Sequence, residues 1–313
     1  MKRQILAAAA LGTLLLTACG DDTSSESTTA PTAAPTTAAA APDTTAAASD
    51  TTAAAMTGGD AAACADGKTL AAGELTIATG DPAFPPYVID DAPESGEGFE
   101  AALALAVAKE MGFEGDAVKW VRTSFDTAVA GSDTNFDFNL QQFTINDERK
   151  QVVSFSDPYY TANQAVVGYA DGPGKDVTKL SDLKSLRLGA AAGTTSLQFI
   201  LDVVKPDAEP FAFNSNADAK TALDNKQIDA IITDLPTGLY ISAVEIEGAK
   251  VFGQFPIDAG GAGDQWGLLL VKDNPLTECT NLALANLTES GELASITDEW
   301  MGQWTEAPTL SKD

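Results

Sequence analysis

From residue 64 onward the hydrophobic positions alternate between two spacings, because short β-branched runs are followed by stretches with helical periodicity. This alternation is typical of an α/β fold. It predicts strands at 75–79, 118–123, 136–140, 165–169, 186–191, 210–213, 228–232 and 265–271, and helices at 99–111, 196–204 and 218–226. Residues 276–304 are predicted to form two helices that break near Ser290 and Gly291. The alternation of strands and helices forms two series, which are followed by one late strand and two final helices. This arrangement favours two lobes.

The start of the chain has the pattern of a secretory signal. Lys2 and Arg3 precede an apolar run over residues 5–16, which is too short to anchor the mature protein across a bilayer. Small residues then precede Cys19, as in the bacterial lipobox, where the cysteine thiol is lipidated and becomes the mature N-terminus. We therefore expect residues 1–19 to be a lipoprotein signal peptide and Cys19 to carry the lipid. An ordinary secretory signal with an incidental cysteine is the alternative.

Residues 20–63 consist mainly of Ala, Thr, Ser and Pro and contain no aromatic residue, Lys or Arg. Such a segment cannot bury a core, so we expect a disordered tether. As a flexible coil its ends would lie roughly 35–40 Å apart, enough to lift a domain off a membrane. A tether of this kind behind a lipobox is typical of Gram-positive, especially actinobacterial, envelopes. The expected location is extracytoplasmic, with the protein held by lipid to the outer face of the cell membrane.

The other two cysteines, Cys64 and Cys279, form an even pair in a compartment that the signal indicates is oxidising. We predict a disulfide between them, which would join the start of the folded region to a helix near its end. By the loop-entropy description, closing a loop of about 215 residues is worth up to about 5 kcal/mol. Two unrelated buried thiols are the alternative.

Composition narrows the possible functions. The 313 residues include 45 Asp and Glu against 18 Lys and Arg, a net charge of −27, and an acidic chain of this kind repels phosphate backbones. We therefore expect no nucleic-acid partner. The absence of histidine excludes Ser-His-Asp and Cys-His nucleophiles and zinc sites built on imidazole. We expect neither a metal nor a cofactor.

Five short motifs follow one another in the folded region. They are Gly98-Phe99-Glu100 at a helix start, Thr144-Ile145-Asn146-Asp147-Glu148-Arg149, Phe155-Ser156-Asp157-Pro158-Tyr159, Gly193-Thr194-Thr195, and Ile228-Asp229-Ala230 ending at Thr233-Asp234. Together they closely resemble the family-3 extracellular solute-binding proteins, the amino-acid receptors of ABC importers. The resemblance covers residues 68–306, and the ordered set is far more specific than any single motif.

The resemblance implies a type II periplasmic-binding-protein fold, with mixed sheets flanked by helices in two lobes and the ligand in the cleft between them. Lobe 1 is expected to comprise residues 64–161 and 259–313, and lobe 2 residues 162–258. The two hinge crossovers between the lobes are expected near residues 158–161 and 257–263.

Two motifs suit the binding of an α-carboxylate. The guanidinium fork of Arg149 can clamp a carboxylate through two hydrogen bonds, which a lysine does not imitate well. Gly193, Thr194 and Thr195 follow an apolar strand and open a helix, where free N–H groups, the helix dipole and two hydroxyls favour a small anion. The alternatives are a surface ion pair of Arg149 with its acidic neighbours at 147 and 148, and a plain helix cap at 193–195.

The resemblance also implies contacts to the α-ammonium and around it. Family members use the aspartate that matches Asp234 to accept hydrogen bonds from the ammonium, although Asp234 is also placed to cap a helix. Asp229, within the same strand, is expected to be structural. Thr144 matches a position that supports the carboxylate, and Gln142 or Gln141 is expected to line the same wall.

Phe84 and Phe125 match the aromatic pair that encloses the ligand side chain in this family. Flat rings hold aliphatic stems by contact area and cations by their negative faces, and simple core packing is the alternative. Asp81 matches a position that carries a carboxylate in relatives preferring basic ligands. It is equally placed to cap a turn before Pro82.

The sequence departs from the family pattern in two places. The usual Gly-Phe-Asp-x-Asp becomes Gly-Phe-Glu-Ala-Ala at residues 98–102, a change that we attribute to helix capping. The bulkier Gln141 and Gln142 replace the small residues that often precede the Thr-Ile motif. We expect the second change to reshape the pocket.

The resulting hypothesis is a monomeric, lipid-anchored solute-binding protein that captures a free polar amino acid in the cleft and delivers it to the permease subunits of an ABC importer. Its expected work is binding, with no bond broken. An extracytoplasmic enzyme on the same fold, of dehydratase or lyase type with Asp or Glu as general acid and base, is the alternative.

Overall fold

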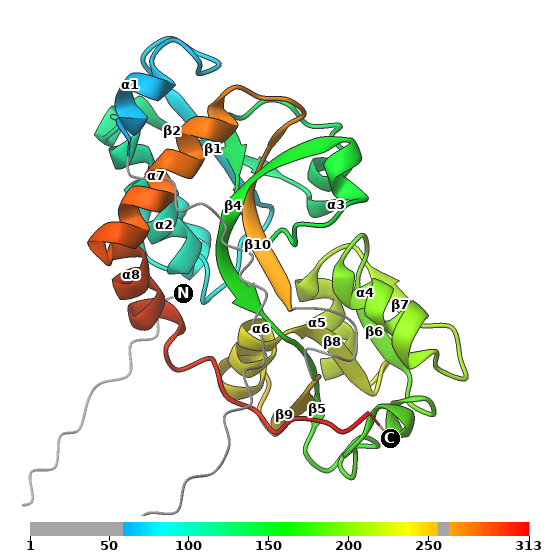
Figure 1. The fold of residues 1–313 in the computed structure, drawn as a ribbon. Helices are drawn as coiled ribbons and strands as arrows, with labels where there is room; N and C mark the ends of the chain where they lie inside the picture. Colours follow the sequence, from blue (N-terminus) through cyan, green and yellow to red (C-terminus); the bar gives the residue numbers. More distant parts are fainter. Residues whose placement is uncertain (1–58, 256–262, 313) are drawn as a thin grey trace, which may run out of the picture. The chain divides into compact units, whose positions relative to one another are not determined.

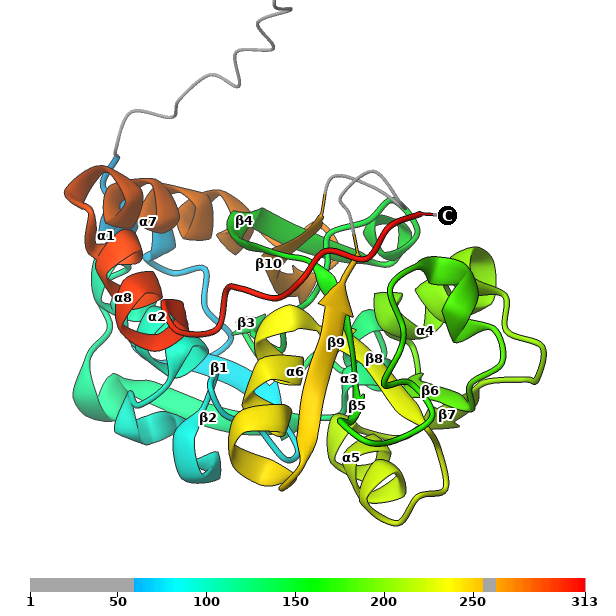
Figure 2. The same cartoon turned by 90° about the horizontal axis from the view of Figure 1, so that it is seen from below.

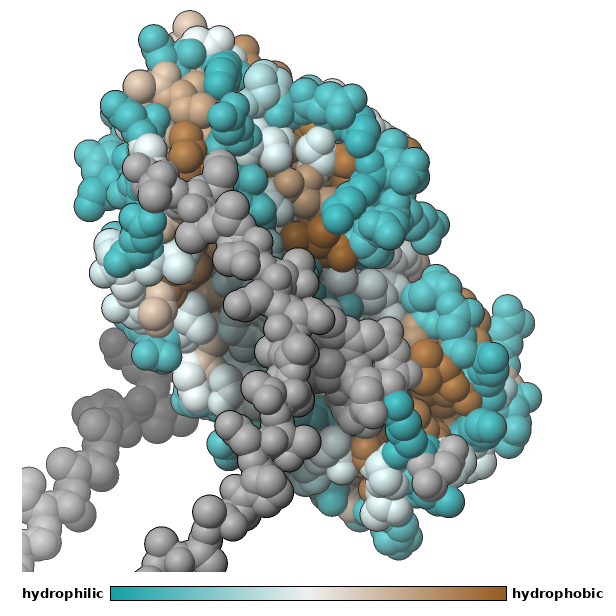
Figure 3. All heavy atoms as spheres, viewed as in Figure 1, coloured by the Kyte–Doolittle hydropathy of each residue, from teal (hydrophilic) through white to brown (hydrophobic). Residues whose placement is uncertain are grey.

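A computed structural model describes residues 59–255 and 263–312 (Figure 1). The expected signal peptide, Cys19 and residues 20–58 of the expected tether lie outside the described residues. Within the two described ranges, no helix has both the length and the apolar character needed to cross a membrane. Hydrophilic side chains dominate the face drawn in Figure 3, in line with the acidic composition.

The first sheet has the strand order β2-β1-β3-β10-β4. Its strands are β1 (Leu75–Gly80), β2 (Val118–Thr123), β3 (Phe138–Asn139), β4 (Val153–Ala162) and β10 (Asp264–Val271). β1 runs parallel to β2 and β3, whereas β10 is antiparallel to β3 and β4. The late strand β10 therefore lies in the middle of a sheet that the early strands began.

Four helices share a core with the first sheet: α1 (Ala61–Ala65), α2 (Phe99–Glu110), α7 (Leu276–Ser290) and α8 (Glu292–Met301) (Figure 1). Leu75 and Ile77 of β1 belong to this core, whereas Ala78 packs in a second core with Phe125, at the start of α3 (Phe125–Val129). The switch between neighbouring residues follows from the alternation of side chains across a strand. Both faces of the sheet are thus buried.

The second sheet has the strand order β7-β6-β8-β5-β9. Its strands are β5 (Gln164–Tyr169), β6 (Leu188–Ala191), β7 (Phe211–Phe213), β8 (Ala230–Asp234) and β9 (Ala249–Gln254). Its helices are α4 (Thr195–Phe199), α5 (Asn216–Asp224) and α6 (Leu235–Tyr240), and π-helical turns at Ile200–Val204 and Ile241–Glu245 extend α4 and α6. Val166 and Val167 of β5 belong to two different cores, so this sheet is also buried on both faces.

The expected fold class and most of the expected elements are confirmed. β2 has the predicted bounds, and the final helices break at Gly291, which adopts a φ of +79° that favours glycine. The strand expected at 136–140 is reduced to the two residues of β3, and the strand expected at 228–232 begins at Ala230. The helix expected at 196–204 is α-helical only in its first half.

Two strands, β4 and β9, were not predicted, and both lie at the edge of their sheet in the strand order. β4 contains Pro158, which cannot donate to a ladder and normally argues against a strand. An edge position removes that objection, because one side of the strand needs no partner. β4 ends at Ala162 and β5 begins at Gln164, so the first crossover is at Asn163, slightly later than expected.

The second expected crossover, at 257–263, lies outside the described residues except for Gly263. The C-terminal tail contacts the second sheet: the Gln254 N–H donates to the Pro308 carbonyl, and the Leu310 N–H donates to the Gln254 carbonyl, both at 2.8 Å. These last residues are part of the expected lobe 1, yet Leu310 packs in a core of the second sheet. Which residues move together as one lobe stays a prediction.

The predicted disulfide is present. Cys64 lies in α1 (Ala61–Ala65) and Cys279 in α7, with a Cα–Cα distance of 5.4 Å and 215 residues between them in sequence. The bond therefore fixes the first described helix to the helices that cover the first sheet.

Candidate ligand-binding site

A cavity of about 90 Å³ lies where loops of the first sheet face loops of the second. At about 10–15 Å³ for each water, it has room for roughly six to nine water-sized groups, so it suits one small molecule. Its lining includes residues at or within a few positions after the carboxyl ends of β1, β3, β6 and β8. Ligands of α/β sheets characteristically bind outside these ends. Eight of the lining residues are Asp81, Phe84, Glu100, Phe125, Gln142, Thr144, Thr195 and Asp234.

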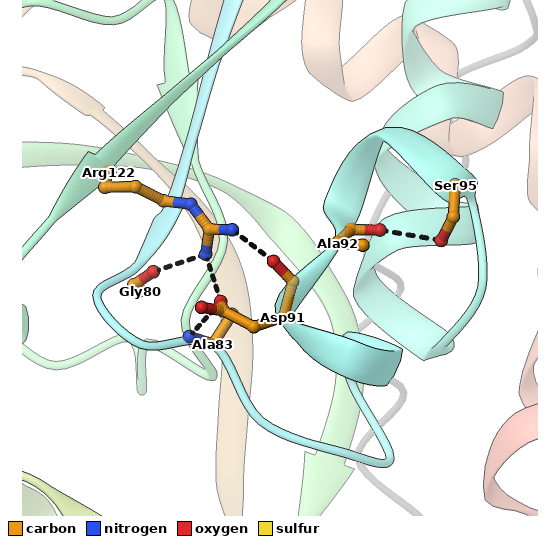
Figure 4. Close-up of polar contacts among 6 residues, drawn as sticks. All are labelled: Gly80, Ala83, Asp91, Ala92, Ser95 and Arg122. Carbon is orange, nitrogen blue, oxygen red and sulfur yellow. Dashed lines mark hydrogen bonds and ion pairs between the residues drawn. The ribbon is translucent and has the colours of Figure 1, made fainter. Parts of the chain in front are cut away.

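The loop after β1, which carries one wall of the cavity, is fixed by an arginine that sequence reasoning missed (Figure 4). The guanidinium of Arg122 donates to the Gly80 carbonyl at 2.8 Å and to the carboxylate and carbonyl of Asp91 at 2.6 and 2.5 Å. The Asp91 carboxylate also accepts the Ala83 N–H at 2.9 Å. These bonds hold both ends of the segment that carries Phe84.

Asp81 and Phe84 both line the cavity from this loop. Asp81 is exposed, and within the described part of the chain its carboxylate makes no hydrogen bond or ion pair. The alternative role as a cap of the turn before Pro82 is therefore not seen. Phe84 is only partly buried, so its ring is available to a ligand as well as to the protein.

Arg149 is not among the residues that line the cavity, but its guanidinium lies over the ring of Phe125, which does line it. Its side chain is 7% exposed, and its guanidinium lies 5.3 Å from the centre of the Phe125 ring. It donates to the Thr144 carbonyl at 2.7 Å and, across to the second sheet's side, to the Gly193 carbonyl at 3.0 Å. The alternative of a surface ion pair is wrong, because the guanidinium is buried and Asp147 pairs with Lys150 instead.

The two threonines at the start of α4 have different hydrogen-bond partners. The Thr194 hydroxyl donates to the Ala191 carbonyl at 2.6 Å and accepts the Leu197 N–H at 3.2 Å, so it caps the helix. The Thr195 hydroxyl instead lies 3.3 Å from the Thr144 hydroxyl, from the other sheet's side. Both threonines line the cavity, but only the hydroxyl of Thr195 bridges it.

Asp234 ends β8 and faces the cavity. It precedes α6 but makes no side-chain capping bond, and it accepts a hydrogen bond from the Gln164 amide at 2.8 Å. The same amide nitrogen donates to Asp264 at 2.5 Å. Burial raises the pKa of Asp234 well above its usual range, and the charge of Asp264 raises it further, whereas Arg149 opposes the shift.

Gln164 and Asp264 were missed by sequence reasoning. Gln164 begins β5 and Asp264 begins β10, so each stands directly after a crossing between the sheets. Burial raises the pKa of Asp264, and it lowers the pKa of Arg149 while the charges of Asp264 and Asp234 act to raise it. Asp229, by contrast, pairs with Arg187 at 2.6 Å, which fits its expected structural role.

Both glutamines line the cavity. The Gln141 amide donates to the Thr123 hydroxyl at 2.7 Å and to Asn139 at 3.1 Å, which ties it to the sheet. Gln142 donates its backbone N–H and its side-chain amide to Glu100 at 2.8 and 2.5 Å. Burial raises the pKa of Glu100 to about 7 against the lowering effect of these bonds and of the Tyr159 hydroxyl.

The described residues contain no group of three or more His, Cys, Asp or Glu placed to hold a metal ion. The cavity offers acidic side chains, hydroxyls and amides set against aromatic rings, and the buried cation Arg149 lies next to this lining. Such a site holds a small polar molecule by charge and shape.

Two mixed five-stranded sheets with a polar cavity between them define a type II periplasmic binding protein. Residues 75–303 match the bacterial extracellular solute-binding proteins, family 3, and the chain belongs to this family.

An arginine-binding periplasmic protein of Mannheimia haemolytica is 29% identical over 75% of this chain and 95% of its own length. A solved ancestral arginine-binding protein bound to arginine is 32% identical with a TM-score of 0.62, and covers 74% of this chain and 99% of its own. The same kind of ancestral protein bound to glutamine is 30% identical with a TM-score of 0.63 and the same coverage.

Proposed function

We propose that this protein captures one free polar amino acid, arginine or glutamine, in its cavity and delivers it to the permease of an ABC importer. The observation that carries the proposal is that the buried carboxylate of Asp234 lines the cavity from the second sheet, while the buried guanidinium of Arg149 lies against Phe125 and bonds to the Thr144 carbonyl, two residues of the opposite wall. A zwitterion needs a cation for its carboxylate and an acid for its ammonium. Relatives named for arginine and for glutamine support the same class of ligand.

The proposed orientation follows from these charges. The α-carboxylate would take up hydrogen bonds from Arg149 and from the Thr195 end of α4, and the α-ammonium would face Asp234. The ligand side chain would then lie between Phe84 and Phe125, with its polar end toward Asp81. The unpartnered carboxylate of Asp81 favours a side chain that carries N–H donors, as arginine and glutamine do.

Hydrogen bonds across the cavity would couple binding to movement of the two sheets. Tyr87 and Thr237 join them through their hydroxyls at 2.8 Å, in addition to the Arg149 and Thr195 contacts. A ligand that bonds to both sides favours the arrangement in which the sides are close. The permease would recognise that arrangement.

We further propose that lipid on Cys19 anchors the protein outside the cell and that residues 20–58 form the tether. The expected end of the tether at residue 63 is wrong, because α1 begins at Ala61, which is buried in the core. Both segments are inferred from sequence, and they agree with membership of an extracellular family. Metabolic labelling with a fatty acid tests the anchor, and Cys19→Ala is expected to abolish the label.

A thermal-shift screen with the twenty amino acids tests the proposed ligand. Binding to the folded state alone raises the melting temperature, so arginine or glutamine should give the largest shifts. Calorimetry should then show one site per chain, and chromatography of the released ligand should recover it unchanged. No shift with any amino acid overturns the proposal, and conversion of the ligand favours the enzyme alternative.

A further inference from the structure

Glu100 is a buried acid in the cavity lining. The residue is 2% exposed, and three donors converge on its carboxylate. One oxygen, Oε1, accepts both the Tyr159 hydroxyl and the Gln142 backbone N–H; the other, Oε2, accepts the Gln142 side-chain amide at 2.5 Å. A carboxylate accepts at both oxygens, so this arrangement fixes which way the Gln142 amide is turned.

The opposite end of that amide is left without a partner in the described part of the chain. Because Nε2 of Gln142 is held by Glu100, its carbonyl oxygen Oε1 points away from Glu100. Gln142 lines the cavity, and within the described ranges Oε1 has no hydrogen-bond partner. This oxygen is also not sealed inside the protein. Among the described residues, the buried side-chain nitrogen or oxygen atom that lacks a hydrogen bond is Nε1 of Trp266, not Oε1 of Gln142.

We propose that Glu100 is a positioning residue, which turns the amide of Gln142 so that its carbonyl oxygen accepts a hydrogen bond from the ligand's α-ammonium. Asp234 lines the same cavity from the second sheet, and Glu100 is close enough for its charge to raise the pKa of Asp234. The ammonium would therefore meet an acceptor from each sheet. The inference rests on the proposed function.

Glu100→Gln tests it with little change of shape. The two donors at Oε1 keep the new amide oxygen in that place, so the new nitrogen faces Nε2 of Gln142. Two donors cannot pair, and Gln142 must turn its own nitrogen into the cavity. Affinities for arginine and for glutamine should fall together by about tenfold, because both ligands carry the ammonium. Calorimetry measures both.

Glu110→Gln is the matched control. It removes the same charge from the other end of α2, where Glu110 accepts a hydrogen bond from Asn286 at 2.8 Å, and should leave both affinities unchanged. Adding Gln142→Glu to Glu100→Gln restores an acceptor: the amide at 100 donates to one carboxylate oxygen at 142, and the other faces the cavity. This double variant should recover affinity to within about threefold of the original protein. A purely structural role of Glu100 predicts no such recovery.

The pH profile gives a second readout. The titratable groups that face Glu100 are Tyr159, Tyr87 and Asp234. Burial holds the pKa of both tyrosines well above 10, so they stay neutral, and protonation of Asp234 weakens ammonium binding in either variant. Protonated Glu100 donates where the carboxylate accepted. From about pH 8 to about pH 6 the affinity of the unmodified protein should fall, and that of Glu100→Gln should fall less.

Four outcomes overturn the inference: unchanged affinity in Glu100→Gln, a loss for only one of the two ligands, failure of the double variant to recover, or a flat profile of the unmodified protein between these pH values. The pH profile of the unmodified protein can be measured, and can overturn the inference, even if Glu100→Gln does not fold. If the unmodified protein binds no amino acid at all, the proposed function itself fails. These results are distinguishable.

Discussion

At the scale of single residues, the charged side chains that line the cavity are acidic, and one buried cation, Arg149, lies against the lining residue Phe125. Arg149 is held by two carbonyl groups and has no carboxylate within hydrogen-bonding distance among the described residues. Asp234 and Asp264 share one amide hydrogen-bond donor, Gln164. Both acids have a raised pKa because they are buried near each other. A ligand with one carboxylate and one ammonium would give Arg149 an anionic partner and would give the buried acids a cationic one.

Removal of the cation is therefore expected to have a large effect. Arg149→Ala leaves the ligand carboxylate half paired in a buried place and should cost about 2–5 kcal/mol of binding free energy, at least about thirtyfold in affinity. Calorimetry with the best ligand of the thermal-shift screen measures it. Arg187→Ala is the control, because Arg187 pairs with Asp229 and does not line the cavity. Near-normal binding by Arg149→Ala would falsify the role.

Glu100 also makes folding stability depend on pH. Its pKa is about 7 in the folded protein against an ordinary 4.5, so between these values the folded state holds a proton that the unfolded state has lost. The free energy of unfolding should therefore fall as pH rises from about 4.5 to about 7, by up to about 3 kcal/mol from this group, and then level off. Urea unfolding without ligand at a series of pH values measures the slope.

In Glu100→Gln that slope should become shallower without vanishing, because burial also raises the pKa of Asp234, Asp264 and Asp137, whose contributions have the same sign. An equal slope in both proteins would show that Glu100 does not carry it.

Sequence predicts some residues of the site and not others for a physical reason. Arg149, Asp234 and Thr195 stand in recognisable motifs next to strand ends; Asp234 and Thr195 line the cavity, and Arg149 contacts two lining residues, Phe125 and Thr144. Gln164 and Asp264 are 100 residues apart in sequence, and they meet because two separate crossings end at the same place. Periodicity reports burial along one element and carries no information about such a partner.

At the scale of elements, the disulfide joins a helix of five residues, α1, to the fifteen-residue helix α7. A helix as short as α1 is unstable alone, so its place depends on the bond and on packing. Ala61 and Ala65 of α1 are buried in the same core as α7. The bond and the packing therefore act on the same point of the fold.

Replacing both cysteines tests this element. The Cys64→Ser, Cys279→Ser variant should lose up to about 5 kcal/mol of unfolding free energy, since its unfolded state is no longer restrained by a 215-residue loop. Urea unfolding without reductant gives the value, and the reduced natural protein should match the variant. Two reactive thiols at Cys64 and Cys279 in the unfolded, unreduced protein would contradict the bond.

Elements with strong local signals were predictable, and elements that depend on neighbours were not. The break between α7 and α8 follows from Gly291, which a positive φ requires. β4 has polar residues and Pro158 inside a run of ten, and it is a strand because β10 offers it a partner along its length. The local sequence of β4 does not reveal this partner, since β10 is about 100 residues further along the chain.

At the scale of the described molecule, the two sheets are joined three times. Asn163 links β4 to β5, the chain returns between β9 and β10, and the C-terminal tail after α8 runs to the second sheet beside β9 (Figure 2). Leu310 of the tail is 2% exposed and packs with the second sheet's core, whereas α8 packs with the first. Movement of one sheet against the other therefore requires the tail to bend or to detach.

Leu310→Ala should loosen this third connection. Truncating a buried leucine to alanine costs about 2–5 kcal/mol of stability where the surrounding structure cannot fill the space. In this case the loss cannot exceed the free energy with which the tail docks on the second sheet, because the tail can detach instead. The Gln254 N–H, which donates to Pro308, should then exchange with solvent faster, and ligand affinity should drop a few-fold, roughly 1 kcal/mol or less, because the sheets spend less time in the arrangement that completes the site. Hydrogen exchange and calorimetry measure the two effects. Thr309→Ala, at an exposed neighbour in the same tail, should change neither. Unaltered exchange at Gln254 in Leu310→Ala would mean that the tail does not depend on this side chain, and the idea of a third tie between the sheets would have to be abandoned.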